Sequence, residues 1–182
     1  MRHLLRATLE EIEASLVDER YPSFLLQYHP AVQDIQILEV LLREGRLLRR
    51  VRYFPKPVIQ AIGLRKVSPH WFGFVSHSTY DFETKVLHFA NEPDNEQIRS
   101  VFSNQGELRF FPLGSQTERI AIGDISLCLP RRLRFLAPLG EFLIRREGLK
   151  ILLGEIPVME RFAKEVLRAP SALPCRKESN TA

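Results

Sequence analysis

The chain has 182 residues, 45% of them hydrophobic and 26% charged, which suits one compact domain with a single core. Its formal charge of +4 is only mildly basic, so ordinary solvation explains it better than nucleic-acid binding does. Cys128 and Cys175 form neither a disulfide framework nor a metal-type spacing with histidine, and we expect reduced thiols in a cytoplasmic protein without metal or cofactor. The first residues turn charged after two leucines, unlike a signal peptide, and no run of roughly 18 apolar residues occurs.

The N-terminal segment predicts a strand followed by two short helices. Residues 3–9 suit the strand, and Thr8 followed by Glu10 and Glu11 is typical of a helix cap with acidic residues in the first turn. A break at 21–22 separates a second short helix, which ends before Pro30 because the residue before a proline disfavours the helical conformation.

Residues 35–42 and 47–53 predict an antiparallel pair of strands joined by a turn at Gly45. Alternation places Leu47, Arg49, Val51 and Tyr53 on one face of the second strand and Arg46, Arg50 and Arg52 on the other. The three arginines on this second face either contact phosphates or form an ordinary solvated face.

The middle of the chain predicts an antiparallel meander. Prolines interrupt the sheet after residue 54, and the apolar stretch 58–64 suits a loop or short helix. Strand-like segments then follow at 71–80, 84–91, 97–103, 107–111 and 118–129, separated by turn residues every dozen positions or so.

The C-terminal part predicts one long amphipathic helix over residues 135–168. Apolar residues recur at three- and four-residue steps at Leu152, Ile156, Met159, Ala163 and Val166. Pro157 is expected to kink this helix or to begin a fresh one. We expect residues 1–168 to form the domain and residues 169–182, which have no apolar period, to be a disordered tail.

Three features carry a resemblance to a known superfamily: the run at 18–22 that ends the first helix, the hairpin at Gly45, and the pattern from Pro138-Leu139-Gly140 to Phe162-Ala163. The chain resembles the START-like and pollen-allergen-like helix-grip proteins (SRPBCC superfamily), and more narrowly small uncharacterised bacterial START-like families. The resemblance implies an α+β fold in which a curved antiparallel sheet of about six to seven strands wraps a long C-terminal helix. It also implies a cavity between sheet and helix that accepts lipids or similar hydrophobic molecules.

Aromatic and large apolar residues are the candidate walls of such a cavity, because ligand pockets are lined mainly by these side chains. The candidate ligand-binding residues are Trp71, Phe74, Phe89, Phe110, Ile122, Phe142, Ile156, Met159 and Phe162. The alternative is a solid core in which the same side chains only fill volume.

Residues that could support catalysis lack partners in the sequence. His70, His77 and His88 have no carboxylate or nucleophile placed beside them by local spacing, although His77 and His88 are expected to face each other across a hairpin centred on residues 82–83. Asp124 lies in an apolar strand, and a bulge at Gly123 is expected to turn it outward. We therefore predict no catalytic residues and no metal ligands.

The sequence favours a non-catalytic carrier or sensor of a hydrophobic small molecule or lipid. A cyclase or aromatase-like enzyme of the same fold is the alternative, as is a protein or nucleic-acid interaction module that uses residues 58–64 or the arginine-rich strand. Arg131, Arg132 and Arg134 flank apolar residues and suit either transient contact with an anionic membrane or a basic cap on a loop.

Overall fold

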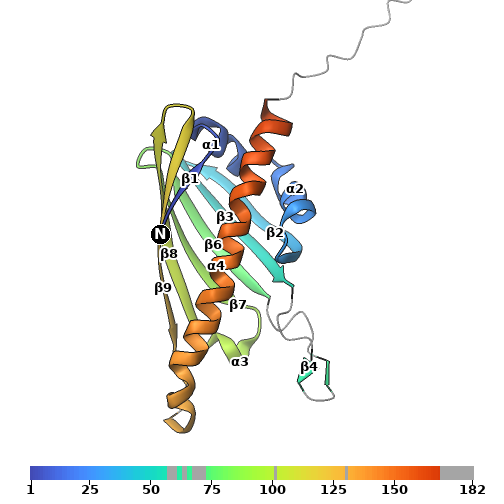
Figure 1. Ribbon diagram of the computed structural model, residues 1–182, viewed down its shortest axis with the longest axis vertical. Helices are drawn as coiled ribbons and strands as arrows, with labels where there is room; N and C mark the ends of the chain where they lie inside the picture. Colours follow the sequence, from blue (N-terminus) through green and yellow to red (C-terminus); the bar gives the residue numbers. More distant parts are fainter. Residues whose placement is uncertain (57–60, 63–64, 67–72, 101, 130, 169–182) are drawn as a thin grey trace, which may run out of the picture.

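The computed structural model describes residues 1–56, 61–62, 65–66, 73–100, 102–129 and 131–168. Its centre is a seven-stranded antiparallel sheet with strand order β1-β9-β8-β7-β6-β3-β2, and the long helix α4 lies along one face of this sheet (Figure 1). The elements in chain order are β1 (Arg2–Leu5), α1 (Leu9–Val17), α2 (Tyr21–Tyr28), β2 (Val32–Arg43), β3 (Arg46–Pro55), β4 (Ala61–Ile62), β5 (Arg65–Lys66), β6 (Phe74–Asp81), β7 (Val86–Pro93), α3 (Glu96–Arg99), β8 (Phe102–Leu113), β9 (Gln116–Leu127), a 3₁₀ helix (Arg131–Leu136), α4 (Ala137–Phe162) and a π-helical turn (Ala163–Leu167).

Local sequence signals set the boundaries of the first elements. The Thr8 hydroxyl accepts a hydrogen bond from the Glu11 amide at 3.3 Å, and the Glu11 carboxylate accepts one from the Thr8 amide at 2.8 Å, which makes a capping box at the start of α1. Glu44 and Gly45 both have positive φ values, 49° and 73°, so β2 and β3 are joined by a two-residue turn of the kind that matches strand twist. These features confirm the predicted cap and the predicted hairpin.

Two predicted segments differ from the structure. Residues 97–103 do not form one strand: the short helix α3 ends at Arg99, and β8 begins only at Phe102. α4 runs through Pro157 without beginning a fresh helix there, and the π-helical turn follows it directly. The proline is tolerated because α4 is held by its packing rather than by helix propensity alone.

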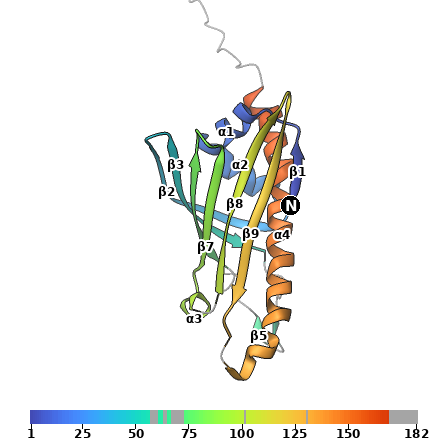
Figure 2. The same cartoon turned by 90° about the vertical axis from the view of Figure 1, so that its left-hand side faces the viewer.

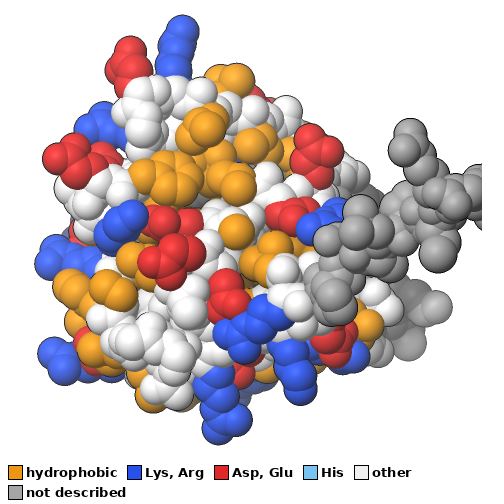
Figure 3. Space-filling view, turned by 90° about the horizontal axis from the view of Figure 1, so that it is seen from above, with side chains coloured by type: hydrophobic (Ala, Val, Ile, Leu, Met, Phe, Trp, Pro, Cys, Tyr) orange, Lys and Arg blue, Asp and Glu red, His pale blue; other side chains and the backbone are white. Residues whose placement is uncertain are grey.

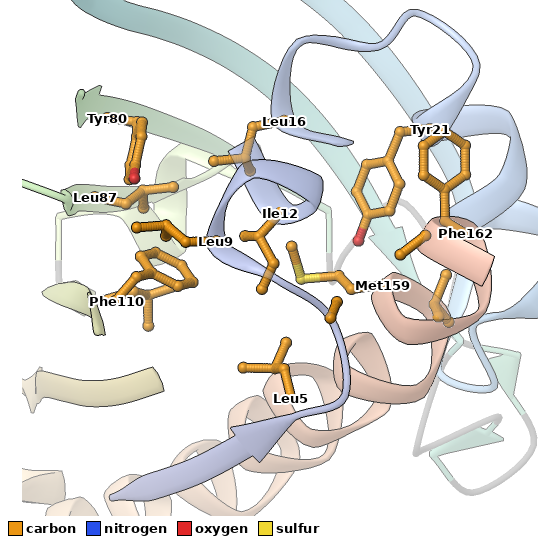
Figure 4. Packing of buried hydrophobic residues seen from close by; sticks show 14 of the residues in the cluster. Leu5, Leu9, Ile12, Leu16, Tyr21, Tyr80, Leu87, Phe110, Met159 and Phe162 are labelled. Atoms are coloured by element: carbon orange, nitrogen blue, oxygen red, sulfur yellow. The ribbon is translucent and has the colours of Figure 1, made fainter. Parts of the chain in front are cut away.

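The core lies where α1, α2 and the C-terminal half of α4 meet one end of the sheet (Figure 4). Leu47, Tyr80, Leu87 and Leu108 are buried and directly paired across β3, β6, β7 and β8, and together they form the sheet side of this core. The ring of Phe162 packs edge-on against Tyr21, with centroids 5.2 Å apart. Burial of these large side chains supplies the main stabilisation at this end of the fold.

A second contact fixes α4 against α2. A Cβ atom at Gly154 would lie 2.9 Å from the ring of His29, so glycine is required for this close approach. His29 Nδ1 accepts a hydrogen bond from the Ala31 amide, and its Nε2 therefore donates to the Ile151 carbonyl at 2.9 Å.

Viewed at right angles, α4 stands beside β1 and β9 (Figure 2).

The surface seen from above, at the end that α1 and the hairpin tips form, carries apolar side chains between charged ones of both signs (Figure 3). No helix among the described residues is long and apolar enough to cross a bilayer.

Candidate functional site

The candidate site is the middle of the inner face of the sheet, which we define as the face that contacts α4. We call the buried row Leu47, Tyr80, Leu87 and Leu108 the core row. Next to it, two further rows of directly paired residues cross β3, β6, β7, β8 and β9. The second row is Arg49, Ser78, Phe89, Gly106 and Gly123, and the third row is Val51, Ser76, Asn91, Asn104 and Ile125. Most of these side chains are small or polar, so they cannot fill the space under a helix as the leucines of the core row do.

Phe89 is the one aromatic side chain of the second row, and it lies over two glycines. Cβ atoms built at Gly106 and Gly123 would be 2.9 Å and 3.7 Å from the Phe89 Cζ atom. Ser76 and Ser78, although they lie on a central strand of the covered face, are only half-buried, and Gly123 is exposed. The middle of the inner face therefore keeps access to solvent, in contrast to the closed core above it.

α4 borders this region along β9. At the lower end, a Cβ atom at Gly140 would lie 2.6 Å from a methyl carbon of Leu127. At the upper end, Arg119 Nη1 donates to Glu155 Oε2 at 3.0 Å and Arg119 Nη2 donates to the Leu152 carbonyl at 2.9 Å. The helix thus follows β9 along the inner face and leaves the rows on β6 to β8 to one side.

Arg119 is the most unusual side chain of the inner face, because it is charged and 0% exposed. Its Nε atom is buried without a hydrogen-bond partner among the described residues. A buried guanidinium with an unused donor is rare, since an unsatisfied buried donor costs about 1–3 kcal/mol.

Two tyrosines lie near Arg119 and Glu155. Burial raises the pKa of Tyr21 well above its usual value and also raises that of Tyr53, and the negative charge of Glu155 adds to both shifts. The Tyr21 hydroxyl points into the packed apolar core (Figure 4) and, like Arg119 Nε, is buried without a partner among the described residues. Arg119, Glu155, Tyr21 and Tyr53 therefore make a polar end to an otherwise apolar interior.

Arg119 was not among the residues predicted from the sequence, because the isoleucines of β9 suggested the wrong phase for this strand. Ile122 is paired with Glu107 on the outer face and is 51% exposed, while Thr117 and Arg119 point inward. The available signal was alternation: Thr117, Arg119 and Ala121 lie at two-residue steps from Gly123 and Ile125 and therefore share a face of the strand with them.

The other predicted ligand-binding residues fall into separate groups. Phe74 and Phe89 lie half-buried on the inner face, and Phe74 stacks on Tyr53 with centroids 5.4 Å apart. Phe142 is 61% exposed on the N-terminal half of α4, and Trp71 lies outside the described residues.

The remaining four predicted wall residues belong to the packed end. Phe110, Met159 and Phe162 are buried members of the core, and Ile156 is partly buried against it. They contact other side chains of the protein, as the solid-core alternative described. Of the predicted residues that the structure describes, Phe74 and Phe89 lie half-buried on the inner face, and Phe89, like Ile156, packs against the core.

His77, His88 and Asp124 lie on the outer face of the sheet, and His70 lies outside the described residues. The β6–β7 register pairs His77 with Ala90 and His88 with Thr79, so the expected direct pairing of the two histidines is wrong by two residues. Asp124 faces Gln105 in an unbroken register, so ordinary alternation turns it outward and no bulge at Gly123 is needed. His77 lies 3.5 Å from Glu92 and His88 lies 3.7 Å from Glu107.

The described residues contain no group of three histidine, cysteine or acidic side chains that could hold a metal ion. The two histidines line a hollow of about 340 Å³ on the outer face, away from α4. Cys128 is exposed.

No family model matches the sequence, and no curated protein does. The Zhui aromatase/cyclase from Streptomyces sp. R1128 superposes with a TM-score of 0.62 at 14% identity, over 95% of this chain and 96% of that one. A protein from Thermus thermophilus gives 0.58 at 18% identity, over 87% and 94% of the two chains. A STAR-related lipid transfer protein fragment from Xanthomonas axonopodis gives 0.54 at 12% identity, over 90% and 84%. Together with the curved seven-stranded sheet and the long C-terminal helix, these likenesses show that the chain has the START-like helix-grip (SRPBCC) fold.

Proposed function

We propose that the protein binds a hydrophobic small molecule or lipid in the space between the curved sheet and α4, as a carrier or sensor without covalent chemistry. The observation that carries the proposal is the pair of small-residue rows in the middle of the inner face. Ser76, Ser78 and Gly123 keep solvent access there, although the strands on both sides of them are paired. The comparison with a lipid transfer protein and an aromatase/cyclase of the same fold supports a ligand of this general kind.

The ligand is amphipathic in this proposal. Its apolar body lies against Phe89, Phe74 and Ile125, and burial of about 200 Å² of apolar surface supplies about 5 kcal/mol before the entropic cost of binding. Its polar end carries an oxygen that accepts hydrogen bonds from Arg119 Nε and the Tyr21 hydroxyl, which relieves two unsatisfied buried donors.

An enzyme of the same fold is the alternative. Catalysis of cyclisation or aromatisation needs an acid or base within hydrogen-bond reach of the substrate. His77, His88 and Asp124 lie on the outer face, so none of them reaches a molecule bound beneath α4. We therefore keep binding as the proposed function.

The nucleic-acid alternative loses its main support on the outer face. Arg46, Arg50 and Arg52 lie 3.0, 3.5 and 3.2 Å from the carboxylates of Asp81, Glu39 and Asp94. Arginines whose charge is already balanced by neighbouring carboxylates attract phosphates weakly.

The binding proposal is tested by filling the space. Native mass spectrometry of the purified protein, followed by organic extraction, identifies any bound lipid, and displacement of an environment-sensitive dye measures affinity. Ser76→Phe places a ring on the inner face and is expected to lower dye affinity at least about tenfold, since no room remains for the apolar body. His77→Phe, one residue along β6 and on the outer face, is the matched control and is expected to leave affinity unchanged.

Melting temperatures of both variants check that they fold, and Asn91→Leu provides a second inner-face change that keeps the number of side-chain heavy atoms. Dye binding that is absent from the native protein, or equal loss in Ser76→Phe and His77→Phe, would contradict the proposed function.

Membrane contact is a second part of the proposal. Arg131, Arg132 and Arg134 are exposed on the 3₁₀ helix, and Phe135 beside them is 76% exposed. Basic residues around an exposed aromatic suit the surface of an anionic bilayer. Co-sedimentation with phosphatidylserine vesicles, compared with phosphatidylcholine vesicles, is expected to fall in Phe135→Ser and to persist in Phe111→Ser, which changes an exposed phenylalanine elsewhere. Equal sedimentation with both kinds of vesicle would contradict the proposed contact with an anionic membrane.

A further inference from the structure

The free edge of the sheet is formed by β2, and its second half is unusually apolar for an exposed edge. Five of its residues, Ile37, Leu38, Val40, Leu41 and Leu42, are between 41% and 68% exposed. Alternation places them on both faces of the strand, so this is an apolar edge rather than one apolar face. A long apolar edge strand offers unpaired backbone groups to another strand.

The backbone phase of this edge follows from the turn. In a two-residue hairpin the residues that flank the loop, here Arg43 and Arg46, exchange both backbone hydrogen bonds. The next pair, Leu42 with Leu47, is not hydrogen-bonded, and the alternation continues to Val40. Leu42 and Val40 therefore direct their amide and carbonyl groups away from β3, toward solvent.

An antiparallel strand can form hydrogen bonds with these groups only if the residues opposite Val40 and Leu42 also have free amide and carbonyl groups that face them. A second copy of β2 does so when Val40 of one protomer pairs with Leu42 of its partner, which sets Leu41 against its own symmetry mate. The same register sets Glu39 opposite Arg43 twice. Shifting by one allowed step in either direction sets Glu39 against Leu41 or against the turn, so charge pairing selects this register.

We propose that two copies of this chain associate through an antiparallel β2–β2 pairing centred on Leu41, with Glu39 of each protomer facing Arg43 of the other. The two seven-stranded sheets become one continuous sheet. Val40 and Leu42 are then covered on the inner face, while Leu41 and the neighbouring Leu48, which is 39% exposed, are covered on the outer face.

Two features of β2 fit the length of this pairing. The register between β2 and β3 shifts between Ile37 and Glu39, and such a bulge ends regular pairing along the edge. In this register Glu44, in the turn of the second copy, lies opposite Leu38, and the pairing ends there. It stays clear of Val32, which is buried where α2 covers the start of the strand. The pairable stretch is therefore the stretch that the fold leaves uncovered.

The charge pairing is tested by exchange in the full chain. Sedimentation-velocity ultracentrifugation over a concentration series gives the monomer–dimer equilibrium. Arg43→Glu sets two carboxylates opposite each other at both ends of the pairing and is expected to raise the dissociation constant at least about tenfold, and Glu39→Arg, which sets two guanidinium groups opposite each other, is expected to do the same. The double variant restores opposite charges and is expected to return the constant to within about threefold of the native value.

The register is tested by cross-linking in a background with Cys128→Ser and Cys175→Ser. Leu41→Cys lies on the two-fold axis as a non-hydrogen-bonded pair with Cα atoms about 4.5 Å apart, which suits a disulfide. It is expected to give a covalent dimer on mild oxidation, whereas Leu113→Cys, equally exposed at another hairpin tip, is not.

A protein that stays monomeric at every concentration, including one that instead captures a peptide strand or lipid at this edge, overturns the pairing. A dimer that is insensitive to both single charge changes, or that cross-links as well through position 113 as through position 41, overturns it too. Neither the charge exchange nor the cross-linking changes Arg119 or the inner face. Failure of the dimer proposal is therefore distinguishable from failure of the ligand-binding proposal.

Discussion

Glu155→Ala tests the role of the buried ion pair, because it removes the only carboxylate that contacts a fully buried guanidinium among the described residues. Breaking a fully buried pair costs about 3–5 kcal/mol, and the 29% exposure of Glu155 lowers this to about 2–3 kcal/mol because water already screens that partner. For a chain of this length the melting temperature should fall by about 4 to 12 °C. Denaturant unfolding followed by circular dichroism measures the free energy directly.

Arg119→Met is the matched control, because it removes the buried charge and keeps most of the side-chain volume. An apolar side chain in place of a buried ion is often neutral, so we expect a change within about 1 kcal/mol, together with weaker ligand binding. A loss below about 0.5 kcal/mol in Glu155→Ala, or a larger loss in Arg119→Met than in Glu155→Ala, would refute the view that Arg119 is a buried charge compensated by Glu155.

Burial, as the largest cause, raises the pKa values of Tyr21, Tyr53 and Tyr80 above 10, so the stability that comes from keeping these phenols protonated is complete below pH 10 and is lost as the pH rises beyond it. Stability should fall as the pH rises above 10, by at most about 4 kcal/mol per pH unit for three such groups, and the absorbance of phenolate at 295 nm should rise together with unfolding; phenolate that forms in the folded protein would contradict this. Gly106→Ala should destabilise the protein by about 3 kcal/mol or more, because the new Cβ would lie 2.3 Å from the Ile122 carbonyl oxygen, whereas Gly148→Ala meets nothing within 4 Å and should stabilise α4 by about 0.5–1 kcal/mol in denaturant unfolding. Equal effects of the two glycine substitutions would show that the close approach of β8 and β9 is not rigid.

Local signals in the sequence predicted many elements of this fold. Thr8 and Glu11 predict the cap of α1, and the cap forms because its hydrogen bonds join residues three positions apart. Gly45 predicts the β2–β3 hairpin for the same reason, since the turn depends on the backbone conformation of two residues. The alternation of Leu47 and Val51 with arginines predicts which side of β3 is buried, because the two kinds of residue differ sharply in hydrophobicity.

The candidate site was harder to predict, because β9 carries apolar residues on both faces. Ile120 and Ile122 lie on the outer face of β9, and Arg119 lies on the inner face. Hydrophobicity alone indicates the reverse. An arginine is stable inside only because Glu155 and the Leu152 carbonyl, 36 and 33 residues away in the chain, meet it there. The relative position of His77 and His88 was missed for a related reason, since a two-residue shift in register keeps the same face of each strand and cannot be read from either strand alone.

The amino-acid sequence by itself determined most of the succession of strands and helices, because periodicity, caps and turns act between neighbours, and its resemblance to helix-grip proteins indicated the overall arrangement. Only the tertiary structure decided which face of β9 is interior, which aromatic residues are buried in the core and which are exposed, and that β2 ends the sheet with an apolar edge. Those outcomes depend on contacts between residues far apart in the chain, and the free energies of such contacts leave no local mark on the sequence.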